Sequence, residues 1–140
     1  MKTTTVIILT MGMLCCFGQG AKSHPEAEKA AVEAAEVWLE LVDTEKYGES
    51  WDRAANYFQG AVSKEQWLSS MQSVRNPLGK KLSRSLKSKQ YYTSLPGAPD
   101  GEYVVIQFNT SFEGKLSAVE TVTPMKDRDG NWHVSGYYIK

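Results

Sequence analysis

Residues 102–112 read Glu-Tyr-Val-Val-Ile-Gln-Phe-Asn-Thr-Ser-Phe, an alternating run that is rich in β-branched and aromatic side chains. Turn-forming residues flank the run on both sides, so the pattern predicts a β-strand. The face of this strand that should be buried carries Val104, Ile106, Phe108, Thr110 and Phe112. The opposite face includes Gln107 and Asn109, which can meet water, a partner or a ligand.

Three helices are expected before this strand. Ser23 and Ser63 each precede an apolar pattern with helical spacing, and Glu26 and Gln66 follow three residues later. This arrangement is typical of a capping box, in which the first side chain and the fourth residue satisfy each other's backbone amides. The expected helices span about 23–43, 50–60 and 63–76.

After the last of these helices the sequence pattern repeats every two residues, which is typical of β-strands. Four strands are expected, and they span about 81–90, 102–112, 116–125 and 132–139. Pro124 lies inside the third strand, and because proline has no amide to donate, a bulge or a strand end is expected there. Helices first and a strand meander second predict an α+β fold, with three N-terminal helices packed on a curved four-stranded antiparallel sheet.

The first 21 residues have the features of a secretory signal peptide. Lys2 gives a positive start, Val6 to Phe17 is apolar and uncharged, and small residues follow. The apolar run is too short for a spanning helix, and we expect cleavage after Gly20 or Ala21. The sequence therefore predicts a periplasmic or secreted protein whose single domain spans 22–140, with no stable membrane span once the signal is removed.

Both cysteines, Cys15 and Cys16, lie within this segment, so the mature chain has none. This excludes thiol nucleophiles, redox motifs and zinc–cysteine clusters. A lipoprotein is the alternative, but Leu14 is larger than the residue expected before an acylated cysteine. We predict no cofactor. We also predict no metal: the run 127–131 resembles the start of a calcium-binding loop, but the twelfth position of that loop, which should be an acidic ligand, is Tyr138.

Charge is unevenly spread although the formal net charge is zero. Residues 26–53 carry nine acidic and three basic side chains, whereas residues 64–89 carry seven basic and one acidic. The pattern predicts internal pairing between the acidic helices and the basic segment. Nucleic-acid binding is not expected, since the basic stretch 80–89 lacks interleaved aromatic residues.

Glu120 and Arg84 are the charged residues of greatest interest, because each shares a strand face with apolar neighbours. A carboxylate in such a place must be paired, reach a pocket, or be protonated. We expect the two to form a salt bridge; the alternative is that they line a ligand cavity. No catalytic residue can be assigned. The candidate pocket or partner-binding residues are Trp51, Trp67, Arg75, Arg84, Tyr103, Glu120, His133 and Tyr137.

Several pieces of the chain keep the order and spacing of a known family. They are Trp51, Trp67, Arg75-x-Pro77-Leu78-Gly79, Arg84, Pro96-Gly97-x-Pro99-Asp100-Gly101-Glu102-Tyr103, Glu120-Thr121-Val122-Thr123, Asp129-Gly130-x-Trp132 and Gly136-Tyr137-Tyr138-Ile139. On these residues the chain resembles the bacterial family called domain of unknown function 4019. The resemblance implies an exported bacterial protein with a cone-shaped α+β fold, similar to the nuclear transport factor 2 and cystatin-like group, and no assigned activity.

Two classes of function fit these observations. The first is non-enzymatic binding of a small ligand or an envelope protein, through a cavity between helices and sheet or through the open sheet face, where a homodimer could also form. The second is a small-molecule isomerase or hydrolase that uses Glu120, with His133 or Tyr137. We favour the first, because no set of base, orienting group and oxyanion donor can be assembled from the sequence.

Overall fold

Four helices precede four strands in the computed structural model, which describes residues 23–140. The predicted α+β fold is therefore confirmed, and the expected signal segment lies outside the described residues. The helices are α2 (Pro25–Asp43), α3 (Tyr47–Asp52), α4 (Asn56–Ala61) and α5 (Lys64–Leu78). The strands are β1 (Lys81–Tyr92), β2 (Tyr103–Phe112), β3 (Lys115–Lys126) and β4 (Trp132–Ile139).

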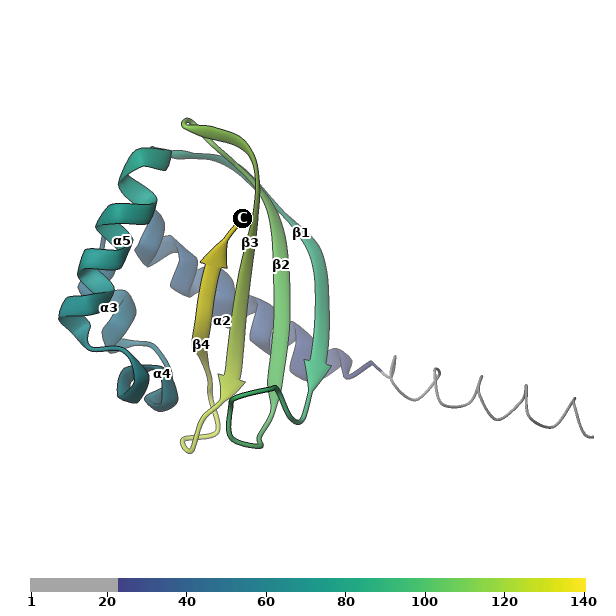
Figure 1. Ribbon diagram of the computed structural model, residues 1–140. Coiled ribbons are helices and arrows are strands. Elements are labelled where there is room, and N and C mark those ends of the chain that lie inside the picture. Colours follow the sequence, from purple (N-terminus) through teal and green to yellow (C-terminus); the bar gives the residue numbers. More distant parts are fainter. Residues whose placement is uncertain (1–22) are drawn as a thin grey trace, which may run out of the picture.

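The strands form one antiparallel sheet in the order β1-β2-β3-β4, so each strand pairs with its neighbour in the chain. Figure 1 shows α2 crossing behind the curved sheet, with α3, α4 and α5 beside β4. Strand β1 lies at one edge and carries several exposed lysines, a common protection against edge-to-edge pairing. All four helices contribute side chains to the core on one face of the sheet.

The apolar face of β2 is buried as its alternation predicts. Ile106 and Phe112 are fully buried, and Thr110 is the least buried residue of that face at 4% exposure. Helix α2 packs against this face with Ala31 and Ala35, both fully buried. Their small side chains allow the helix to approach the sheet closely, which is why an alanine-rich face serves here.

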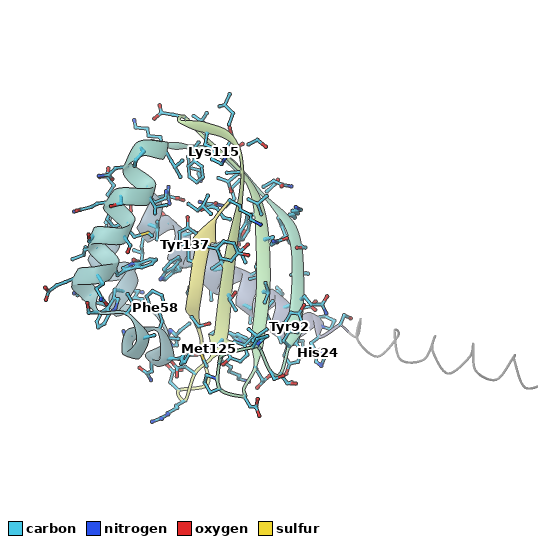
Figure 2. All side chains as sticks on the ribbon, in the orientation of Figure 1. His24, Phe58, Tyr92, Lys115, Met125 and Tyr137 are labelled. Atoms are coloured by element: carbon cyan, nitrogen blue, oxygen red, sulfur yellow. The ribbon has the colours of Figure 1, made fainter. Side chains whose placement is uncertain are left out.

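Aromatic side chains fill the space between the helices and β4. Trp38 of α2 and Tyr137 of β4 meet edge to face at 5.3 Å, and Phe58 of α4 meets Trp67 of α5 at 5.0 Å. The fully buried Ser50 serves both indoles: Trp38 Nε1 donates to its carbonyl at 2.8 Å, and Trp67 Nε1 donates to its Oγ at 2.9 Å. Figure 2 labels Phe58 and Tyr137 in this region. The space between the helices and β4 is thus packed with side chains.

The expected second helix is in fact two helices. The break falls at Ala55, whose ψ of 150° is extended and whose amide donates to the Val134 carbonyl of β4 at 2.8 Å. The next amide, that of Asn56, donates to Asp127 Oδ2 at 3.0 Å. These contacts with the sheet override the local helical pattern. The prediction of a single helix over 50–60 was therefore wrong.

The two predicted capping boxes have different outcomes. In α5 the box is confirmed: Ser63 Oγ accepts from the Gln66 amide, and the Gln66 side chain accepts from the Ser63 amide. In α2 it is wrong, because His24 is the N-cap and makes no side-chain capping bond. Pro25 occupies the first turn there and lacks an amide that would need a cap. The α5 helix also continues one residue past Pro77 rather than stopping before it.

Strand β4 departs from simple alternation. Trp132, Val134 and Tyr137 all pack against the main core, although alternation would place Tyr137 on the opposite face. The pairing of β3 with β4 shifts register between Val122 and Pro124, and this shift changes which residues point inward. The irregularity expected at Pro124 is therefore confirmed.

Candidate functional site

A network of buried charges lies where the sheet meets the end of α2. Arg84 of β1 binds Glu120 of β3 through Nε to Oε1 at 2.7 Å and Nη2 to Oε2 at 3.1 Å. The side chain of Glu120 has no solvent exposure, and that of Arg84 has 11%. The salt bridge that the sequence predicts between these two residues is confirmed.

Two hydroxyl groups complete the shell around Glu120. Thr110 of β2 donates to Oε1 and Tyr137 of β4 donates to Oε2, each at 2.5 Å. Together with the two bonds from Arg84, they use the four acceptor positions that a carboxylate offers. Burial, and then the nearby negative charge of Glu120, raise the pKa of the Tyr137 hydroxyl well above its ordinary value. Tyr137 is therefore a neutral hydrogen-bond donor at physiological pH.

Asp43, the last residue of α2, links this pair to a second arginine. Its Oδ2 accepts from Arg84 Nη1 at 2.7 Å, and its Oδ1 accepts from Arg84 Nη2 at 2.9 Å and from Arg75 Nη2 at 3.0 Å. Burial alone would raise the pKa of Asp43, but the hydrogen bonds and charges of Arg84 and then Arg75 outweigh it and lower that pKa. The same carboxylates raise the pKa of Arg84 despite its burial.

The pairing of acidic helix with basic segment is likewise confirmed. Besides Arg75 and Arg84, Lys81 approaches Asp43 at 3.9 Å, and Lys64 binds Asp52 at 2.9 Å. Asp43 is the centre of three of these contacts, and sequence reasoning did not single it out. The sequence does contain a feature that could have identified Asp43: a carboxylate in the last turn of a helix interacts unfavourably with the helix dipole and needs cationic partners. Thr110 was likewise assigned only to the core.

An apolar cavity of about 480 Å³ lies on the other side of α2. It is bounded by α2, by the end of α3 and by the first residues of β4, toward the end of the sheet where Figure 2 labels Met125. Its apolar lining residues are Ala34, Val37, Trp38, Leu41, Trp132 and Val134, and its charged or polar lining residues are Glu33, Asp52, Arg53 and His133. Val37 is 60% exposed, so a large apolar side chain faces this opening.

The remaining predicted site residues are dispersed. The indoles of Trp51 and Trp67 donate to the Val62 carbonyl and to Ser50, as core tryptophans do. Tyr103 is buried against the connection between β1 and β2 and donates to the Pro99 carbonyl. His133 lines the apolar cavity and pairs with Asp129 at 2.9 Å, and this hydrogen bond lowers the pKa of Asp129.

The outer face of the sheet carries neutral polar side chains. Gln107 is half-buried, and its amide donates to Thr121 Oγ1 at 3.3 Å. Asn109 is exposed on the same face, as is Tyr138 of β4. Tyr103 also belongs to this face by alternation, yet the loop before β2 covers it. The open part of the face is therefore narrower than the strand pattern suggests.

Between residues 23 and 140, no helix is both long and apolar enough to cross a bilayer. Within the same residues, no group of three or more histidine, cysteine, aspartate or glutamate side chains is arranged to hold a metal ion.

The class of protein follows from these observations: an α+β domain with a packed interior, a buried ion-pair network and an apolar cavity beside helix α2. A family model described as a protein of unknown function, DUF4019, matches residues 34–137. The match covers both the helices and the sheet, and the chain belongs to this family. Among curated proteins no relative matches the chain.

Proposed function

We propose that this protein is an exported domain that binds a small, largely apolar molecule in the cavity between α2, α3 and β4, without catalysing its conversion. The observation that carries the proposal is the apolar wall of that cavity. Its volume of about 480 Å³ falls within the range typical of small-molecule sites, which are mostly apolar with a few polar groups at the edge. Trp132, which lines the cavity and is only partly buried, provides a large, rigid contact surface for such a ligand.

The state of Glu120 supports binding over catalysis. A general base must hold a free acceptor within reach of a substrate proton. All the acceptor positions of Glu120 are occupied by Arg84, Thr110 and Tyr137, and the side chain is fully buried. The predicted isomerase or hydrolase would need this network to open, whereas the apolar cavity needs no such change.

A neutral fluorescent probe such as N-phenyl-1-naphthylamine tests the binding site. We expect the purified protein to bind the probe with enhanced emission, and Val37→Glu to weaken binding at least about tenfold, because a charge would enter an apolar contact. Val74→Glu is the matched control: Val74 is an exposed valine on α5 that does not line the cavity. Equal probe binding by both variants would refute the assigned site.

Native mass spectrometry of the protein from its own compartment addresses the natural ligand. We expect a retained apolar molecule that is released unchanged. Conversion of that molecule by the protein would instead favour the enzymatic alternative. The same preparation tests export, since the proposal requires a mature chain that begins near residue 21 or 22 and is recovered outside the cytoplasm. An uncleaved cytoplasmic chain would contradict it.

A further inference from the structure

A second, polar cavity lies at the far end of α2. Its volume is about 240 Å³, and it shares no lining residue with the apolar cavity. The C-terminal ends of α2 and α5 and the β2–β3 hairpin form it, at the end of the sheet where Figure 2 labels Lys115. The lining residues are Val42, Asp43, Glu45, Tyr47, Arg75, Asn76, Gly79, Lys80 and Glu113.

Arg75 is the unusual member of this cavity. It is 4% exposed, its guanidinium lies 4.8 Å from the centre of the Phe112 ring, and its one hydrogen bond runs from Nη2 to Asp43. Its Nε and Nη1 are buried and have no partner among residues 23–140. Buried charged groups normally have their hydrogen bonds satisfied, and each exception calls for an explanation such as a bound ion.

A comparison with Arg84 shows what Arg75 lacks. Arg84 makes four hydrogen bonds and binds both Glu120 and Asp43 in bidentate fashion. Asp43 is therefore mainly committed to Arg84 and shares a single oxygen with Arg75. Lys80 lines the same cavity, and its ammonium forms no ion pair within the described part of the chain. Two cationic side chains with unused donors thus border one small cavity.

We propose that this cavity binds a small monoanionic carboxylate, which accepts hydrogen bonds from Nε or Nη1 of Arg75 and pairs with the ammonium of Lys80. Guanidinium groups match carboxylates in both geometry and charge. A phosphate, with a charge of about −1.5 to −2 at pH 7, would be repelled more strongly by Glu45 and Glu113, which also line the cavity. Because Nε and Nη1 are shielded, binding must include a small movement of the cavity wall.

The test follows the Nε–Hε resonance of Arg75 by NMR while acetate is added to the purified protein. Chloride at matched ionic strength and inorganic phosphate are the comparison titrations. We expect a saturable shift with acetate that is absent with chloride and weaker with phosphate. A shift that is equal for acetate and chloride, or the absence of any saturable shift, would overturn the proposal. Tighter binding of phosphate would overturn the assigned ligand class.

A variant pair links the effect to this cavity without disturbing the buried network. Lys80→Gln should weaken acetate binding about fivefold, the loss expected for one exposed charge pair. Lys87→Gln removes another exposed lysine, on β1 and outside the cavity, and should leave the affinity unchanged. Equal affinities for the two variants would contradict the assignment. We expect Lys80→Gln to leave probe binding in the apolar cavity unchanged, and the carboxylate proposal does not depend on that binding. The two proposals can therefore fail independently.

Discussion

Arg84 and Glu120 lie on strands that are not neighbours, and their side chains meet above the strand between them. On β2, Thr110 pairs with Arg84, and Phe108 pairs with Glu120. The long guanidinium side chain spans this strand and holds Glu120 in two hydrogen bonds. The network therefore joins the edge strand β1 to β3 independently of the backbone ladder, and Asp43 extends it to α2.

Removing one member of the pair should be costly. We expect Glu120→Gln to lower the free energy of unfolding by about 3 kcal/mol or more, since it leaves a buried arginine without one of its two carboxylate partners. Glu36→Gln, on the exposed side of α2, should change it by less than ~0.5 kcal/mol. Urea denaturation of both variants measures the difference.

Replacing both partners separates pairing from packing. The double variant Arg84→Met with Glu120→Leu removes both charges and leaves Asp43 with Arg75, so it should be less destabilised than Glu120→Gln. If the double variant instead loses as much free energy of unfolding as the two single variants lose together, Arg84 and Glu120 do not stabilise the fold through their pairing. If it keeps its stability but loses ligand binding, the pair serves a site rather than the fold.

The stability of the protein should depend on Asp43 at acidic pH. Its pKa is lower in the folded state than in the unfolded chain, where an aspartate titrates at about 3.9. The stabilisation is therefore complete above that value and is lost as the pH falls through the lower, folded-state pKa. Urea midpoints of the wild type and Asp43→Asn should differ most near neutral pH and converge below about pH 4. A difference that stays constant with pH would contradict this assignment.

The close approach of the β2–β3 hairpin to α5 depends on a glycine. A Cβ at Gly114 would lie 2.5 Å from the Pro77 carbonyl oxygen and 3.1 Å from that of Leu78. Both are backbone atoms that cannot turn aside, so Gly114→Ala should cost about 1–3 kcal/mol. Gly60→Ala is the control, because a Cβ added there would meet no atom within 4 Å outside its own helix backbone, and alanine favours a helix. Thermal unfolding that ranks Gly114→Ala at or above Gly60→Ala would disprove the steric argument.

Local pattern predicted much of this fold, and the missed break in the second predicted helix has a tertiary cause. The buried face of β2, the Ser63 cap and the Arg84–Glu120 pair follow from spacing and residue type alone. The break at Ala55 arises instead from a hydrogen bond to β4, a segment far away in the sequence. Contacts of this kind also make the candidate sites, since both cavities are bounded by residues from several separate elements. No periodicity within one segment could reveal them.

Glu45 follows α2 with a backbone φ of 62°, in the left-handed region that glycine occupies most easily. The amides of Glu45 and Lys46 donate to the carbonyls of Val42 and Leu41, which is the Schellman arrangement of a helix end. Because a side chain in this conformation costs roughly 1–2 kcal/mol, Glu45→Gly should stabilise the protein by about 1 kcal/mol. Glu45→Ala removes the same carboxylate but keeps the strained Cβ, so we expect it to give little of that gain. Equal stabilisation of the two variants in urea denaturation would assign the effect to the lost charge rather than to the backbone.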